Sequence, residues 1–257
     1  TFLFIGNLIL GLLSILFLNK KRAYRIFTYL MGLSWLILTF TLALRWIING
    51  TIPIANGYET MLLLSWLIMI VSILTTYKLQ LMTTFGLLMS GFMLLVSHLG
   101  EMDPSITPRM PVLNSPLLSI HVSIIMISYA LFSLTFICAI AYFLTYRSKK
   151  ANIIQTNKQL TTLSQIFLYP AITTLGLGIF IGAIWANISW GTYWGWDPKE
   201  TWALITLMVY AIVLHKQSLP TFRKPLNYHL YMIIAFLSIL MTYFGVNYVL
   251  GGMHSYA

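Results

Sequence analysis

Residues 117–143, LLSIHVSIIMISYALFSLTFICAIAYF, contain no Asp, Glu, Lys or Arg. A helix needs about 20 predominantly apolar residues to cross roughly 30 Å of hydrocarbon, so this stretch is long enough to span a bilayer. Because such stretches are continuously apolar rather than alternating, they exclude a transmembrane β-barrel. The sequence predicts an all-α, polytopic transmembrane helix bundle with about eight spans. The predicted spans are 2–18, 27–48, 61–76, 79–97, 117–143, 165–188, 198–219 and 228–249.

The composition agrees with this fold class. The 257 residues are 59% hydrophobic and 8% charged, with a mean hydropathy of +0.84, whereas soluble domains carry roughly a quarter charged residues. Eight spans would use about 160 residues and leave about 100 for loops, so we expect residues 1–257 to form a single transmembrane domain. The single cysteine, Cys138, excludes a disulfide framework, a CxxC pair and a cysteine-rich metal site within this chain. We expect it to be a small packing residue.

The charges are divided between the two sides of the predicted bundle. Twelve of the 15 basic residues, and no acidic residue, fall in the loops 19–26, 77–78, 144–164 and 215–227, while all five acidic residues fall on the other side. The positive-inside rule makes these loops cytoplasmic, so both ends of the chain are expected on the extracytoplasmic side. Basic residues spread over four short loops do not form a nucleic-acid-binding face, and we exclude nucleic acid as a partner.

Aromatic residues are concentrated in one extracytoplasmic segment, the Trp-rich loop of residues 189–202. Its sequence from residue 190, WGTYWGWDPKETW, holds four of the eight tryptophans. An aromatic belt at the headgroup level would be scattered over many span ends, and it remains the alternative interpretation. Indole rings give large flat apolar contacts, and glycines allow close backbone approach, so we predict a platform for a flat hydrophobic ligand. The predicted ligand contacts are Trp190, Gly191, Tyr193, Trp194, Trp196, Asp197 and Trp202.

The same segment also indicates a helix start. Asp197 is suited to the N-cap, Pro198 to the first helical position and Glu200 to the third. This structural role accounts for Asp197 by itself, so we assign it no catalytic role.

Two of the five histidines are predicted at the depth of the Trp-rich loop. His121 lies about one turn inside the fifth span, and His254 follows the last span. Neutral imidazoles are common haem ligands, and we predict this pair as axial ligands of a haem iron, although a single interfacial histidine is ordinarily unremarkable. His98 competes for either position. His215 is either a span-end residue or a ligand at an inner site, and His229 is expected to be interfacial.

The extracytoplasmic side holds three cations, Arg45, Arg109 and Lys199, each of which could pair with a haem propionate. For Arg45, snorkelling to lipid headgroups is an equal alternative. Glu59 could cap the third span, because carboxylates favour a helix N-terminus.

These residues resemble a known family. WGTYWGWD at 190–197 is similar to the WGxxWxWD signature of the haem-handling membrane proteins of cytochrome c biogenesis. DPKETWAL at 197–204, AIWAN at 183–187, NGYE at 56–59 and the final GGMHSY resemble the CcsA (ResC) branch in particular. The resemblance covers roughly residues 50–257. The CcmC and CcmF branches share the Trp-rich core and differ around it.

The resemblance implies site residues and partners. His121 and His254 would ligate haem b (iron protoporphyrin IX) at an outer site, and His215 would belong to an inner entry site. The second inner ligand would come from a CcsB (ResB) partner, which is sometimes fused upstream. Because the chain begins at Thr1 inside an apolar run, we expect it to be part of a longer product.

The resemblance also implies a reaction, the attachment of haem to the CxxCH motif of apocytochrome c through thioethers. The chain with CcsB would act as a holocytochrome c synthase of system II, with a separate thiol reductant. The membrane would be the bacterial inner membrane or, as a second choice, the thylakoid. CcmC-like haem delivery without thioether formation and a membrane electron-transfer cytochrome remain alternatives. A transporter is disfavoured, because we find no paired Gly- or Pro-broken spans in two related halves.

Overall fold

The computed structural model describes residues 2–17, 21–54, 56–99, 104–105, 115–147, 150–215 and 217–250, and every regular element within them is helical. Six of these helices are long and apolar enough to cross a membrane, which confirms the predicted all-α membrane fold class. At the two other predicted spans, 2–18 and 198–219, the helices are shorter, with 14 residues each.

The helices follow one another with short connections. The α-helices are α1 (Leu3–Leu16), α2 (Lys21–Asn49), α3 (Gly57–Thr75), α4 (Leu81–Leu99), α5 (Pro116–Thr145), α6 (Ala151–Trp190), α7 (Pro198–Ala211) and α8 (Pro225–Leu240). Two 3₁₀-helices, η2 (Ile212–His215) and η3 (Pro220–Arg223), lie between α7 and α8. A π-helix, η4 (Met241–Leu250), continues α8.

The predicted loop 144–164 is wrong over most of its length, because α6 begins at Ala151. This helix has 40 residues, about 60 Å at 1.5 Å per residue, which is roughly twice the thickness of the hydrocarbon. Its polar first turns are invisible to a search for apolar stretches. They are nevertheless helical and are tied to the end of α5, where Thr145 Oγ1 donates to Asn157 Oδ1 at 2.7 Å.

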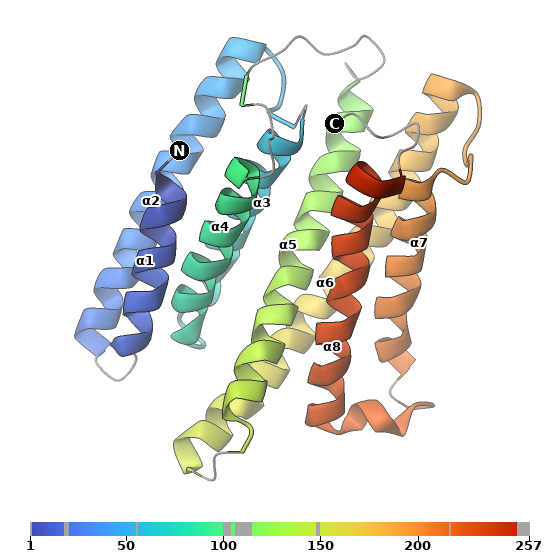
Figure 1. Ribbon diagram of the computed structural model, residues 1–257. Coiled ribbons are helices and arrows are strands. Elements are labelled where there is room, and N and C mark those ends of the chain that lie inside the picture. Colours follow the sequence, from blue (N-terminus) through green and yellow to red (C-terminus); the bar gives the residue numbers. More distant parts are fainter. Residues whose placement is uncertain are drawn as a thin grey trace. The chain divides into compact units, whose positions relative to one another are not determined.

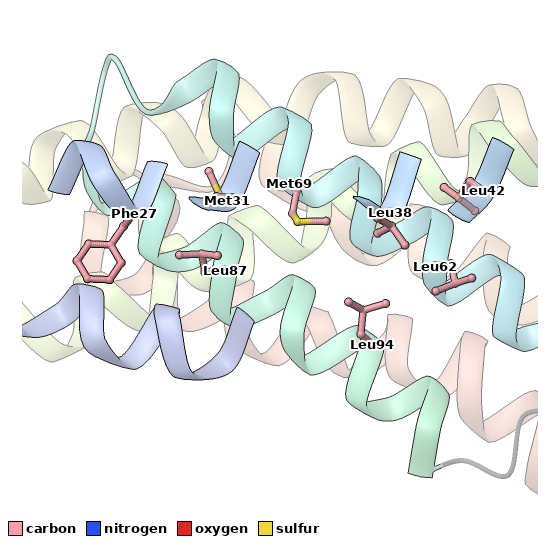
Figure 2. Packing of buried hydrophobic residues seen from close by; sticks show 8 residues of the cluster. All are labelled: Phe27, Met31, Leu38, Leu42, Leu62, Met69, Leu87 and Leu94. Atoms are coloured by element: carbon pink, nitrogen blue, oxygen red, sulfur yellow. The ribbon is translucent and has the colours of Figure 1, made fainter. Parts of the chain in front are cut away.

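The chain divides into two compact units, unit 1 (Thr1–Asn114) and unit 2 (Ser115–Ala257). In unit 1, side chains from α2, α3 and α4 converge on one apolar cluster (Figure 2). The cluster comprises Phe27, Met31, Leu38, Leu42, Leu62, Met69, Leu87 and Leu94. Asn7 of α1 joins these helices by polar contacts, accepting from Ser34 at 2.7 Å and donating to Ser90 at 3.2 Å. Such buried hydrogen bonds are a usual way to hold helices together in a membrane.

Unit 2 consists of α5, α6, α7 and α8 side by side (Figure 1). The turn between α5 and α6 and the 3₁₀-helix η3 lie at one end, and the start of α5, the end of α6, the start of α7 and η4 lie at the other. We call this second end the loop end of unit 2. Cys138 is fully buried in α5, which confirms its predicted packing role.

Candidate functional site

The Trp-rich loop leaves α6 through a glycine turn. Trp190 is the last residue of α6, and Gly191 follows with φ 79°, in the left-handed region that glycine adopts without strain. The Gly191 N–H donates to the Asn187 carbonyl at 2.9 Å, which satisfies one of the last carbonyls of the helix. Residues 191–197 then form no regular element until α7 begins.

The start of α7 confirms the predicted helix signal. Asp197 is the N-cap, and its Oδ1 accepts from the Lys199 N–H at 2.9 Å, within a capping box completed by Glu200. Glu200 Oε2 accepts from the backbone N–H of Asp197 at 3.3 Å and of Gly195 at 2.9 Å. Two carboxylates therefore hold the backbone of the loop in place, and the Asp197 side chain is itself buried.

The aromatic rings of the loop fall into two groups. Trp190 lies edge-on to the buried Trp185, with ring centroids 4.8 Å apart and planes at 71°, and anchors the loop to α6. Trp194 and Trp196 form a second perpendicular pair at 5.9 Å and 88°. Trp196 is 73% exposed and Tyr193 is 61% exposed, so the tip of the loop displays apolar rings instead of burying them.

The backbone of Trp196 is strained. Its φ of 57° is the only positive φ of a non-glycine residue in the described part of the chain. A bulky side chain in this region costs of order 1–3 kcal/mol, and such strain often accompanies functional sites. The loop therefore maintains an exposed indole at an energetic cost.

His121 lies in the second turn of α5 and packs against α6. Its Nδ1 is 2.7 Å from the Gly178 carbonyl oxygen. Since a carbonyl can only accept, Nδ1 carries the proton and Nε2 holds the lone pair. That tautomer is the one in which Nε2 can bind a metal ion.

The π-helix η4 is joined to the start of α7 by polar contacts. Lys199 Nζ donates to Asn247 Oδ1 at 2.7 Å, and Thr242 Oγ1 donates to the Trp202 carbonyl at 3.2 Å. Trp202 is half-buried at this contact. Extended π-helices are rare and are frequently found at functional sites. His254 comes four residues after the end of η4 and lies outside the described residues.

Comparison with known proteins identifies the family. Residues 54–254 match the family of cytochrome C assembly proteins. The chain belongs to this family. It is 37% identical over 263 residues to protein NrfI of Wolinella succinogenes, an alignment that covers all of this chain and 29% of NrfI. It is 33% identical over 240 residues to the cytochrome c biogenesis protein CcsA of Chlamydomonas reinhardtii, covering 88% of this chain and 67% of that protein.

A third relative, the cytochrome c biogenesis protein CcsA of Guillardia theta, is 30% identical over 274 residues, covering 95% of this chain and 89% of that protein. These matches confirm the resemblance drawn from the Trp-rich loop and its flanks, and the chain is of the CcsA type. Cytochrome c biogenesis is therefore its general role, and it is an integral membrane protein.

The other histidines of this cytochrome C assembly protein have different surroundings. His98 is exposed at the end of α4 in unit 1 and stacks on Phe4 at 5.2 Å, beside a cavity of about 40 Å³ that has room for little more than a water molecule. His215 is exposed at the end of η2, and its Nδ1 is 3.1 Å from the Ala211 carbonyl oxygen.

His229, which we expected to be interfacial, is fully buried instead. Its Nε2 is 3.0 Å from Thr161 Oγ1, and its ring stacks on Tyr142 at 4.3 Å, so it joins α8 to α6 and α5. Its position near the end of α8 in the sequence suggested exposure, because the helical extension of α6 that covers it was predicted as loop.

Arg45 and Glu59 form a buried ion pair in unit 1. Their Nε and Oε1 atoms are 3.0 Å apart, and the side chains are only 11% and 2% exposed. Arg45 also donates to the carbonyls of Pro104 at 2.9 Å and Ser105 at 3.3 Å. The cap of α3 is Asn56, whose Oδ1 accepts from the Glu59 N–H at 2.9 Å, so the prediction that Glu59 is the cap is wrong.

This pairing changes the ranking of the extracytoplasmic cations. The charge of Arg45 is compensated by Glu59 within unit 1, which weakens Arg45 both as a propionate partner and as a snorkelling side chain. Lys199 donates to Asn247 at the loop end of unit 2. Arg109 lies outside the described residues.

The sequence interpretation missed the glycines of α6 that face His121. A Cβ atom added at Gly182 would lie 2.6 Å from His121 Cε1, closer than side chains approach one another. The spacing Gly178-x-x-x-Gly182 is a small-residue pattern typical of close helix contacts, and it could have given this signal.

Proposed function

We propose that this chain holds haem at the loop end of unit 2 and presents it for covalent attachment to apocytochrome c. The observation that carries the proposal is the exposed, strained Trp196, held beside Trp194 by a loop whose backbone is fixed by Asp197 and Glu200. An indole kept out of the interior at an energetic cost suits a surface that receives a flat apolar ligand.

In this proposal the iron is ligated by His121 and His254. Support for His121 comes from its hydrogen bond to the Gly178 carbonyl, which leaves the lone pair on Nε2. Ligating histidines commonly donate their other ring N–H to a carbonyl or carboxylate in this way. Support for His254 is its place in the sequence, shortly after η4, which Lys199 and Asn247 connect to the start of α7.

The Trp-rich loop would lie against one face of the porphyrin, contacting it through Trp190, Gly191, Tyr193, Trp194, Trp196, Asp197 and Trp202. The protein would supply iron ligation, orientation and an exposed vinyl edge, and the reacting groups would come from haem b and the CxxCH segment. Each cysteine S–H adds across one vinyl C=C, forming one C–S and one C–H bond, so the addition needs no external electron acceptor. The histidine of CxxCH would replace one protein imidazole on the iron.

The remaining parts of the proposal concern delivery and partners. His215 would belong to an inner entry site, completed by a ligand from a CcsB partner, and a separate reductant would keep the apocytochrome thiols reduced. The active face would be extracytoplasmic, and the membrane would be the bacterial inner membrane or the thylakoid. The chain spans 29% of the length of NrfI, so the full synthase activity would include parts outside it.

The test compares histidine variants of the chain produced together with its partner. We expect His121→Ala and His254→Ala to lose most of the haem seen in the absorption spectrum of the purified complex, and His98→Ala to retain it. Unchanged haem content in the first two variants would refute the ligand assignment.

A second measurement tests the reaction. Pyridine haemochrome spectra of a co-produced CxxCH apocytochrome distinguish thioether-bound haem from haem with free vinyl groups. Haem that binds the complex but never appears as thioether would refute the synthase proposal and favour delivery to a haem chaperone.

A further inference from the structure

Two glycines of α6 and two side chains of α5 fit into one another. Gly178 and Gly182 are one helical turn apart, as are His121 and Ile125. A Cβ atom at Gly182 would lie 2.6 Å from Cε1, 2.8 Å from Nδ1 and 3.3 Å from Nε2 of His121. A Cβ atom at Gly178 would lie 2.5 Å from Ile125 Cδ1. The imidazole therefore occupies the space that a side chain at position 182 would need.

The hydrogen bond of His121 depends on that space. Nδ1 reaches the Gly178 carbonyl at 2.7 Å only because the ring lies directly against the backbone of α6 at Gly182. In a regular helix the same carbonyl also accepts from the Gly182 N–H, so its two lone pairs serve both donors. The two glycines thus form a seat: position 182 supplies the room and position 178 supplies the acceptor.

This seat constrains the direction of the imidazole. A ring held on one side by a helix backbone and bonded through Nδ1 cannot rotate freely about χ2, so Nε2 keeps one orientation. We propose that Gly182, together with the Gly178 carbonyl, is a positioning element that aims His121 Nε2 at the haem iron. The inference rests on the proposed role of His121 as a haem ligand. Contacts of this kind behind a ligating histidine typically change metal affinity by about 10- to 100-fold.

A purely structural role for the glycines is the competing explanation, because small residues four apart allow helices to pack closely in membranes. The chain offers matched variants that separate the two. Gly182→Ala presses on the imidazole, and Gly178→Ala presses on Ile125 while keeping the carbonyl. Gly176→Ala lies on the same helix, where a Cβ meets only Leu207 Cδ1 at 4.0 Å, an ordinary contact.

The size of the displacement sets the expected effect. A methyl group at position 182 would come about 0.8 Å closer to Cε1 than the 3.4 Å at which ordinary contact begins, so the ring must shift by about that amount. Misplacement of an active group by about 1 Å can cost on the order of 100-fold in function. We expect Gly182→Ala to lower haem affinity at least about tenfold and to move the remaining haem from a low-spin to a high-spin spectrum.

The experiment uses the full chain with its partner and normalises haem to monodisperse protein, so that a loss of folded protein does not count as a loss of haem. Gly176→Ala should match the parent. Gly178→Ala should lower the yield of folded protein but leave the haem spectrum per folded protein unchanged. Equal losses and unaltered spectra in Gly178→Ala and Gly182→Ala would overturn the inference in favour of packing alone.

A double variant tests whether Gly182 acts through His121. In a His121→Ala background, Gly182→Ala should cause no further loss of haem, because the ring on which the methyl acts is absent. An additive loss would overturn the positioning role. If His121→Ala itself keeps its haem, the proposed ligand fails. If His121→Ala loses haem while Gly182→Ala keeps the parental spectrum, the positioning role alone fails.

Discussion

Trp196→Gly separates the ligand surface of the loop from its stability. The indole is 73% exposed, so about a quarter of its surface, roughly 60 Å², is buried, which is worth about 1.5 kcal/mol at 25 cal/mol per Å². Loss of the edge contact with Trp194 costs about another 1 kcal/mol. Glycine also adds about 0.4–1 kcal/mol of unfolded-chain entropy.

Against these losses, glycine at a φ of 57° removes backbone strain of about 1–3 kcal/mol. The terms nearly cancel, and the expected net change is about 1 kcal/mol of destabilisation. For a chain of this size that corresponds to a shift of about 2–4 °C in Tm. Haem retention, in contrast, should fall severalfold, because the exposed ring is the part of the loop that meets the ligand.

The assay measures haem per folded complex after purification, together with thermal unfolding of the same samples. Trp196→Tyr keeps a flat ring at the same backbone position and serves as the control, which should retain most of the haem. The reasoning is refuted if Trp196→Gly keeps the haem content and spectrum of the parent. It is also refuted if Tm falls by more than about 10 °C, because the indole would then be a structural residue.

Three further predictions follow from the described contacts. Glu59→Gln, which leaves the Arg45 guanidinium without its buried counter-charge, should destabilise unit 1 by about 3–5 kcal/mol, measured as a lower melting temperature, and Arg45→Met combined with it should recover part of the loss. An unchanged melting temperature in the single variant would contradict this. Asp197→Ala should cost about 1 kcal/mol and make the Trp-rich loop more sensitive to limited proteolysis, whereas Asp197→Asn should stay close to the parent; equal cleavage of all three proteins would count against the capping role. Cys138 should remain unlabelled by maleimide in the folded protein and react in denaturing detergent, and rapid labelling of the native protein would show that its burial is wrong.

The sequence predicted the features that depend on local pattern. Continuous apolar stretches predicted the membrane helices, and Asp197, Pro198 and Glu200 predicted a helix start that the structure confirms atom by atom. The Trp-rich loop carried the resemblance that the family match confirms. Each of these signals lies within a few consecutive residues, which is why no knowledge of the packing was needed.

Features that join distant residues could not be predicted in this way. Arg45 and Glu59 are 14 residues apart on different helices, and only the packing of α2 beside α3 makes them partners. His121 and Gly178 are 57 residues apart. The polar extension of α6 was missed for another reason: lipid-facing composition identifies where a helix crosses the membrane, while helical structure continues wherever residues favour it.

The Trp-rich loop distributes stability and ligand binding over different residues of one short motif. Gly191 turns the chain, Trp190 anchors it, and Asp197 and Glu200 hold its backbone. These contacts leave Trp196 displayed in a strained conformation that it would otherwise relax. A single substitution in the first group should therefore weaken haem binding indirectly, by loosening the loop, and stabilising the fold elsewhere should not restore it. The residue types of the motif follow from this division: glycine for the turn, carboxylates for the backbone N–H groups, and indoles both behind the loop and on its exposed tip.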